Sequence, residues 1–446
     1  MAIAPSLERL DDLLRRARKA GADAADAVFV QGASLSIAER LGKPEKLERA
    51  EGRDLGLRVF VGKRQAIVSS SDISSQALGE LAERAVAMAK AVPEDPFCGI
   101  ADPADLATTV PELDLCDPDE PATETLMTRL REAEDAARSV PGVTNSEGAE
   151  AGWSRSLVAL AATNGFRQGY AVSSSSISVS VLAGEGTAME HDYDFTSAVY
   201  GSELESPAVM GKRVGEKAVR RLNPRKVSTI KVPIIFDPRV SNSIVGHLAG
   251  AINGAGIARG VSFLKDKMGK IVLPAGMDII DDPHRRRGLR SRPFDGEGLA
   301  NRRMALVEDG VLKTWVLDLR SARQLNLKST GHAARGTSSP PGPSTTNLYL
   351  SAGKETPKQL MADIESGFYC TDLIGFGVNN VTGDYSRGAS GFWIEKGELA
   401  YPVSEITIAG NLIEMFQNLR AANDLTFRFG TNAPTLRIDG MTVAGR

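Results

Sequence analysis

Apolar residues near the N-terminus recur first at helical and then at strand spacing. One helical face, ended by Gly21, carries apolar side chains at three- and four-residue intervals: Leu7, Leu10, Leu14 and Ala17. Alternation then predicts four strands, at residues 27–31, 34–40, 56–61 and 65–69. Gly62 and Lys63 form the turn of a hairpin between the last two strands. Short turns rather than crossovers join these strands, which predicts an antiparallel sheet.

A second amphipathic helix follows from Ser75, and its apolar face is made by Leu78, Leu81, Ala82, Ala85 and Met88. Residues 93–121 are rich in proline and aspartate, and we expect a linker or a loop that follows the surface. A third helix begins at Thr123, with Leu126, Leu130, Ala133 and Ala137 in line.

Two further strands are predicted around a turn at Asn164 and Gly165, at residues 157–162 and 169–182. The second contains many serines, but they alternate with Ile177, Val179 and Val181, which predicts one buried face. A helix over residues 206–222 then ends in a basic cluster: Arg220, Arg221, Arg225 and Lys226.

Strand patterns dominate beyond residue 228, at residues 230–236, 304–308, 313–318, 348–350 and 392–394. Asp309 and Gly310 predict a hairpin turn, and we place Phe392 and Trp393 in a core. The fold class is therefore α+β, with an N-terminal region of helices and antiparallel sheet before a strand-rich C-terminal domain. We predict an α+β subdomain at 1–92, a linker at 93–121, a second α+β subdomain at 122–227 and a β-rich domain at 228–446.

Composition narrows the function classes. The 446 residues carry 53 basic and 56 acidic side chains, so no general attraction to nucleic acid or to an anionic membrane is expected. Three cysteines without a CxxC pair support neither a disulfide framework nor a thiolate zinc site. Charged residues interrupt the N-terminal segment and no apolar run reaches about 20 residues, so we expect a soluble cytoplasmic protein.

Three glycine-rich segments carry a family resemblance. The first reads Asn-Asn-Val-Thr-Gly-Asp-Tyr-Ser-Arg-Gly over residues 379–388, where two nearby glycines favour a tight turn with a charged tip. The second is Phe-Asp-Gly-Glu-Gly at 294–298, and the third is Glu-Ile-Thr-Ile-Ala-Gly-Asn-Leu at 405–412. Together they resemble the TldD/PmbA family, specifically its PmbA branch, also called TldE.

In the TldD branch, the resemblance implies a helix carrying His-Glu-x-x-x-His, which binds zinc and supplies a general base. The corresponding helix here begins at Asp237 and Pro238, and its matching residues are Asn242, Ser243 and His247. The third zinc ligand of that branch is a cysteine near the C-terminus, but residues 423–430 contain none. One imidazole cannot hold zinc, so we predict no metal site and no catalytic residue in this chain.

The histidines also have ordinary structural roles. We expect His247 to be a buried neutral side chain that hydrogen-bonds a carbonyl. Strand alternation should send His191 and Asp192 to opposite faces, with His191 solvated. His284 opens a basic run that is either a solvated loop or an anion contact, and His332 is assigned no chemistry.

Asn379, Asp384 and Arg387 are the candidates for substrate or partner contacts on the glycine-flanked turn. A purely structural alternative is equally open, in which Asp384 pairs with Arg387 and Asn379 caps the turn.

The resemblance implies a non-catalytic subunit that pairs with a zinc-bearing TldD-type chain and acts on unfolded peptides, peptide antibiotics or toxin–antitoxin proteins. Homodimers are also expected when the chain is alone. Two alternatives stay open. One is an independent metallopeptidase with an atypical ligand set, such as His247 with His191 or His332. The other is a non-proteolytic binding protein that modulates DNA gyrase.

Overall fold

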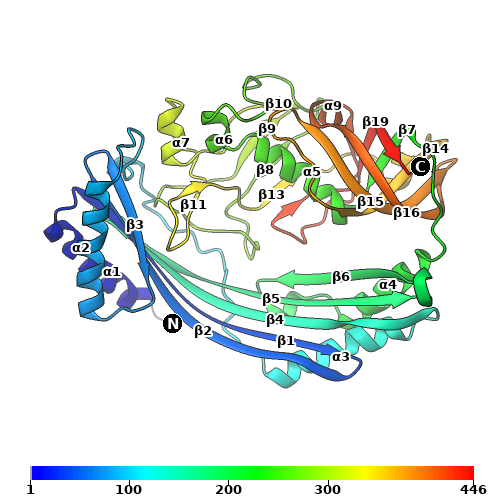
Figure 1. Ribbon diagram of the computed structural model, residues 1–446, viewed down its shortest axis with the longest axis horizontal. Coiled ribbons are helices and arrows are strands. Elements are labelled where there is room, and N and C mark those ends of the chain that lie inside the picture. The colour runs from blue at the N-terminus through cyan, green and yellow to red at the C-terminus, as the bar shows by residue number, and fades with distance from the viewer. Residues whose placement is uncertain (1–2, 446) are drawn as a thin grey trace.

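A computed structural model describes residues 3–445 of the chain, which form two stacked layers (Figure 1). One layer is a long curved antiparallel sheet built from the N-terminal half. The C-terminal half forms the second layer, which lies over the side of this sheet that the helices of the N-terminal half leave uncovered. The α+β prediction is therefore confirmed. No helix among residues 3–445 combines the length and the apolar character needed to cross a bilayer.

The curved sheet has the strand order β3-β2-β1-β4-β5-β6. Its strands are β1 (Ala24–Arg40), β2 (Lys43–Val61), β3 (Arg64–Ser70), β4 (Val143–Ala162), β5 (Arg167–Ala183) and β6 (Glu190–Ala198). Because β1 pairs with both β2 and β4, strands from before and after residues 93–121 belong to one sheet. That segment contains the short 3-10 helix η1 (Pro103–Asp105) and is otherwise irregular. It does not simply follow the surface, because Ala107 and Leu115 are buried, the Ala107 amide donates to the Gly298 carbonyl, and the Leu115 carbonyl accepts from the Ser173 amide of β5. The predicted division into four segments, with its three boundaries, stays a prediction.

Two pairs of helices cover one face of this sheet (Figure 1). They are α1 (Ile3–Ala20), α2 (Ser75–Ala91), α3 (Thr123–Arg138) and α4 (Pro207–Arg220). The first pair packs on residues such as Phe29 and Leu57, and the second pair on Trp153 and Ile177. Met88 is 43% exposed, so its predicted place on the buried face of α2 is wrong, and Val86 and Ala89 are buried there instead.

Several strands are longer than their apolar patterns predict. β1 is one continuous strand, where two were predicted. The first part of β2 was missed because residues 43–53 are exposed and carry no apolar alternation. The alternation in β5 is confirmed, since Ile177, Val179 and Val181 are buried.

The C-terminal layer contains two main sheets. The larger has the order β16-β15-β14-β7-β19-β17, and an additional β16–β19 pairing closes it on itself. Its strands are β7 (Ile230–Phe236), β14 (Ser366–Ile374), β15 (Asp384–Glu395), β16 (Glu398–Asn411), β17 (Leu419–Ala421) and β19 (Leu436–Ala444). The smaller has the order β10-β9-β8-β13-β18, made of β8 (Ile279–Asp281), β9 (Met304–Glu308), β10 (Val311–Leu312), β13 (Leu348–Leu350) and β18 (Thr431–Asn432).

Short helices and a small hairpin complete this layer. The helices are α5 (Pro238–Ala251), α6 (Gly254–Ala258), α7 (Leu319–Gln324), α8 (Pro357–Met361) and α9 (Leu412–Gln417). The hairpin pairs β11 (Ala333–Ala334) with β12 (Gly342–Pro343), and β11 is drawn between the C-terminal layer and the curved sheet in Figure 1.

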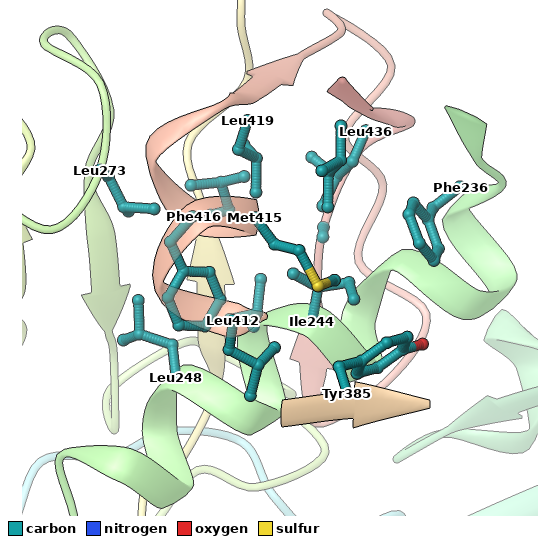
Figure 2. Packing of buried hydrophobic residues seen from close by; sticks show 14 of the residues in the cluster. Phe236, Ile244, Leu248, Leu273, Tyr385, Leu412, Met415, Phe416, Leu419 and Leu436 are labelled. Carbon is teal, nitrogen blue, oxygen red and sulfur yellow. The ribbon is translucent and has the colours of Figure 1, made fainter. Parts of the chain in front are cut away.

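Helix α5 packs against strands of both C-terminal sheets, so it lies inside the largest core. Figure 2 shows Ile244 and Leu248 of this helix among Leu412, Met415 and Phe416. Burial of each such side chain contributes about 1.5–3 kcal/mol to the stability, so α5 stabilises the core.

Two local predictions about the C-terminal half are wrong and two are confirmed. Residues 313–318 are not a strand, because Val316 bonds the backbone of Ile252 instead of continuing the sheet. Phe392 is only partly buried and lies under the Arg220 guanidinium, whereas Trp393 is 6% exposed and belongs to the core. The predicted hairpin turn is present, with φ of 48° at Asp309 and 75° at Gly310.

Candidate functional site

The candidate site begins at helix α5, whose start follows from its first two residues. The Asp237 side chain accepts a hydrogen bond from the Arg239 amide, and Pro238 occupies the first turn. Val240, Ile244 and Leu248 bury one face of the helix. The three positions that match the zinc motif are partly exposed. Asn242 and Ser243 lie off that face, whereas His247, three residues after Ile244, lies at its edge.

His247 lies against strand β15. Its ring meets the ring of Tyr385 edge to face, with 5.8 Å between the centroids. The Nε2 atom of His247 is buried and makes no hydrogen bond to any group in residues 3–445, so the predicted bond to a carbonyl is wrong for this nitrogen. Burial lowers the pKa of His247 below its ordinary value, and the nearby Arg387 guanidinium lowers it further. The imidazole is therefore held neutral.

Tyr385 shares this environment. Its hydroxyl is also buried without a partner among the described residues, and burial raises its pKa well above the ordinary value, with a smaller contribution from Cys370. Figure 2 shows Tyr385 at the margin of the cluster that contains Ile244 and Met415. Sequence reasoning treated Tyr385 only as part of a motif, because an aromatic residue in a strand usually indicates packing.

The donor set here does not fit zinc. Ser243, at the position of the general base, donates to the Val240 carbonyl at 2.6 Å. This is a local contact within the helix and does not polarise a water molecule as a general base would. Within residues 3–445, no group of three His, Cys, Asp or Glu side chains converges as a metal site requires. Burial raises the pKa of the Cys370 thiol, so this cysteine is far from being a thiolate ligand.

The other histidines lie elsewhere. His191 is half exposed and points away from Asp192, which confirms the predicted alternation. His284 contacts the Asn301 side-chain oxygen at 2.8 Å and is partly exposed rather than fully solvated, and the anion contact stays a prediction. His332 is 2% exposed and lies 3.1 Å from Asp281.

The ring contact of His247 with Tyr385 places the degenerate helix against the glycine-flanked segment, and Arg387 of that segment contributes to lowering the pKa of His247. Asn379 caps its turn as the structural alternative predicted, since its oxygen accepts from the Val381 amide at 2.9 Å. The predicted Asp384–Arg387 pair is absent from the described residues. Asp384 instead accepts from Thr382 and Asn411, and these hydrogen bonds lower its pKa.

An apolar tip adjoins this site and was not predicted. Its three residues, Ile374, Phe376 and Val381, are 66%, 105% and 58% exposed. We call this group the 374–381 tip. Phe376 stands between Gly375 and Gly377, and a large apolar residue held between two glycines at a strand end is the signal that could have revealed it.

Buried ion pairs fix the site relative to the curved sheet. Asp192 of β6 accepts from Arg221 and from Arg239 of α5, each at 2.6 Å. Arg221 also donates to Thr371 at 3.0 Å and to Ser390 at 2.9 Å, both in the C-terminal layer. The basic cluster at the end of α4 therefore contributes an interlayer contact through Arg221.

Comparison with known proteins places this architecture in a family. Three family models match consecutive parts of the chain: PmbA/TldA metallopeptidase domain 1 at residues 25–89, the central domain at 116–222, and the C-terminal domain at 229–445.

Individual relatives match over nearly the full length. Metalloprotease PmbA from Escherichia coli O157:H7 is 36% identical over 95% of this chain and 93% of its own, and the PmbA homologue of Haemophilus influenzae is 38% identical over 96% and 94%. The crystal structure of a proposed modulator of DNA gyrase from Bacteroides thetaiotaomicron superposes with a TM-score of 0.90 at 25% identity, covering 98% of both chains. TldE from Thermococcus kodakarensis superposes at 0.87 with 20% identity over 98% and 100%, a likeness of fold.

Proposed function

This chain belongs to the PmbA/TldD metallopeptidase family, and we propose that it is the non-catalytic subunit of a TldD/TldE-type zinc peptidase complex. One observation carries the proposal. On the helix that matches the zinc motif, Asn242 and Ser243 replace the first ligand and the general base, and His247 has no converging second and third donor within residues 3–445.

A subunit without a metal can still act in proteolysis. It completes the wall of a substrate chamber and offers strand edges on which an extended peptide adds by backbone hydrogen bonds. The substrates we propose are unfolded peptides, peptide antibiotics and toxin–antitoxin proteins, because recognition through the backbone has little sequence selectivity. The cytoplasm is the compartment we propose, in keeping with the free cysteines Cys98, Cys116 and Cys370.

The partner we propose is a TldD-type chain, which would hold the zinc. Relatives named metalloprotease TldD homologue match 45% of this chain at 26% and 28% identity, which supports a TldD-type chain of related sequence as the partner. A chain that buries a large surface against a similar fold also has the means to pair with itself when purified alone.

The 374–381 tip is the surface we propose for that partner, together with Asn379, Asp384 and Arg387. Because Phe376 is fully exposed, its replacement should not lower the stability of the isolated chain, whereas in a complex its ring has a large apolar area to bury. We expect Phe376→Ser to keep the melting temperature and to weaken association with the TldD-type chain by at least about tenfold, as measured by calorimetric titration. Ile271→Ser, which alters a 67% exposed residue elsewhere, is the matched control and should bind normally.

The decisive test is reconstitution. Three samples are compared: this chain alone, the TldD-type chain alone, and a mixture of the two. Each is assayed for zinc by elemental analysis and for cleavage of unfolded peptides. We expect zinc in the partner and peptidase activity in the mixture. Chelator-sensitive cleavage by the isolated chain would disprove the proposal.

Two other functions are supported by the names of relatives. The metalloprotease names favour an independent peptidase with an atypical ligand set, but His191, His247 and His332 do not converge within residues 3–445. The gyrase-modulator description of a structural relative favours a non-proteolytic binding protein. Affinity capture from cell extract distinguishes this function from the proposed one. A gyrase-binding protein would capture gyrase as its dominant partner, whereas the proposed subunit would capture a TldD-type chain.

A further inference from the structure

A cavity of about 100 Å³ lies between the curved sheet and the C-terminal layer, away from the degenerate zinc motif. The sheet contributes an apolar floor made by Val28, Val158, Leu160 and Tyr170. The C-terminal layer contributes the opposite wall, made by Arg292, Phe294, Asp295, Gly296, Ala334 and Arg335. Three of the wall residues, Phe294, Asp295 and Gly296, come from the Phe-Asp-Gly-Glu-Gly segment, to which the proposed function assigns no role.

Arg335 is the unusual member of this wall. Its side chain is only 2% exposed, and its Nη1 pairs with Asp26. Its Nε and Nη2 atoms are buried and have no hydrogen-bond partner in residues 3–445. These two nitrogens form the edge of a guanidinium that grips a carboxylate with two parallel hydrogen bonds. In the same cluster, Arg58 turns this edge towards the Asp26 carboxylate: its Nε and Nη2 both donate to Oδ2, and Nε also donates to Oδ1 at 3.3 Å.

Arg292 adds a third unpartnered donor. Its Nη1 and Nη2 donate to the carbonyls of Ala333 and Ser344, both at 3.0 Å, while its Nε is buried without a partner among the described residues. Unpartnered buried donors on cations are costly, and a cavity with several of them favours a negatively charged guest.

The surrounding charges also favour an anion. Burial would raise the pKa of Asp26, but Arg335 and Arg58 outweigh it and keep this carboxylate ionised. Burial raises the pKa of both Asp295 and Glu297, the latter to about 8 against the opposing effect of Arg58. At neutral pH the three guanidinium groups therefore face fewer than three full negative charges.

We propose that this cavity binds a carboxylate carried on a short apolar group, held by the Nε and Nη2 edge of Arg335 with Arg292 beside it. The apolar part would lie on Val158, Leu160 and Phe294, and the partly exposed Val158, Tyr170 and Ala334 mark the mouth. The volume suits a small aliphatic acid or the last residue of a peptide with a small apolar side chain, but not a nucleotide.

The test uses the isolated full-length chain and calorimetric titration with three probes: butyrate, the free acid of N-acetyl-Ala-Val, and its C-terminal amide. Saturable binding of the acids but not of the amide supports the site. Binding of the peptide acid with no binding of butyrate identifies a peptide C-terminus as the source, and the reverse identifies a free acid. Absence of binding by both acids overturns the proposal.

Two variants locate the binding. Arg335→Lys keeps the charge but removes the two-pronged edge, and should weaken binding about ten- to hundredfold. Val158→Phe fills the cavity from the sheet side without touching the arginines and should abolish binding, which keeps the test decisive if Arg335→Lys fails to fold. Arg15→Lys, at a side chain 73% exposed on α1, is the matched control. Unchanged affinity in both variants would also refute the site. Because no peptidase activity is measured, the outcome is independent of the proposed function.

Discussion

Glu297 is a carboxyl group with a side chain only 2% exposed, held by the Leu319 amide at 2.9 Å. Arg58 lies 3.6 Å away and already binds Asp26 at shorter distances, so it compensates the burial of Glu297 only in part. Burial therefore dominates and raises the pKa of Glu297 to about 8. Sequence reasoning could not find this, because nothing in Phe-Asp-Gly-Glu-Gly reveals which layer will cover the glutamate.

The raised pKa has a defined effect on stability. A carboxyl that is protonated in the folded state adds stability that is fully present below its unfolded pKa and is lost as pH rises towards about 8. We expect Glu297→Gln to remove this term, so that its free energy of unfolding should fall less steeply between pH 5 and 8, by about 1 kcal/mol per pH unit. Urea titrations across this range measure the slope. Glu83→Gln, at an exposed position of α2, should retain the wild-type slope, and parallel curves for Glu297→Gln would contradict the assignment.

His247 gives a second prediction at this scale. Because its Nε2 is buried without a partner among the described residues, an apolar replacement of similar size loses no hydrogen bond from that nitrogen. We expect His247→Leu to change the free energy of unfolding by less than about 1 kcal/mol and to leave the zinc content and the activity of the reconstituted complex within twofold. Loss of zinc together with activity would show that this imidazole is a metal ligand.

At the scale of elements, the contact between strand β2 and the loop after β11 is tight. A Cβ built on Gly56 would lie 2.0 Å from the Thr337 carbonyl oxygen, whereas one built on Gly52 of the same strand meets nothing within 4 Å. Glycine is therefore required at residue 56 by close approach rather than by backbone conformation.

This pair of glycines makes a matched experiment. Gly56→Ala should destabilise the protein by about 1–3 kcal/mol, because a backbone cannot yield as a flexible side chain does. Gly52→Ala should be neutral within about 0.5 kcal/mol. Thermal melting of both variants under identical conditions measures the difference, and equal melting temperatures would show that the loop moves freely away from β2.

Helices and strands were predictable from sequence where one face is buried and the other is exposed to solvent. The alternation of β5 and the stripe of α1 are of this kind, and both are confirmed. Prediction failed where residues are exposed on both faces, as in residues 43–53, or where Val316 is buried in irregular backbone. In the site, the motif positions on α5 were identified, but contacts such as His247 with Tyr385 depend on tertiary packing and leave no periodic signal.

At the scale of the whole molecule, buried charges join the two layers. Asp192 of the curved sheet accepts from Arg221 and Arg239, and Asp194 accepts from Arg428 at 2.7 Å. When one buried charge is removed, its partners stay buried without a compensating charge. Removing one member therefore lowers the stability more than replacing the whole cluster would.

We therefore expect Asp192→Asn to lower the free energy of unfolding by about 3 kcal/mol and to separate the unfolding of the two layers into distinguishable transitions. Differential scanning calorimetry detects both effects. Glu398→Gln, which disrupts an exposed pair with Lys358, is the control and should leave the melting curve unchanged. A single wild-type transition in Asp192→Asn would mean that contacts other than the Asp192 cluster hold the layers together.

Helix α5 has one more consequence, which concerns evolution. Its buried face supports the core through Val240, Ile244 and Leu248, while the positions of the first ligand and the general base, Asn242 and Ser243, lie outside that face. Mutational drift at Asn242 and Ser243 can therefore remove a metal ligand and a general base without endangering the scaffold. Such a separation lets a duplicated gene give rise to an inert companion of an active enzyme in very few steps.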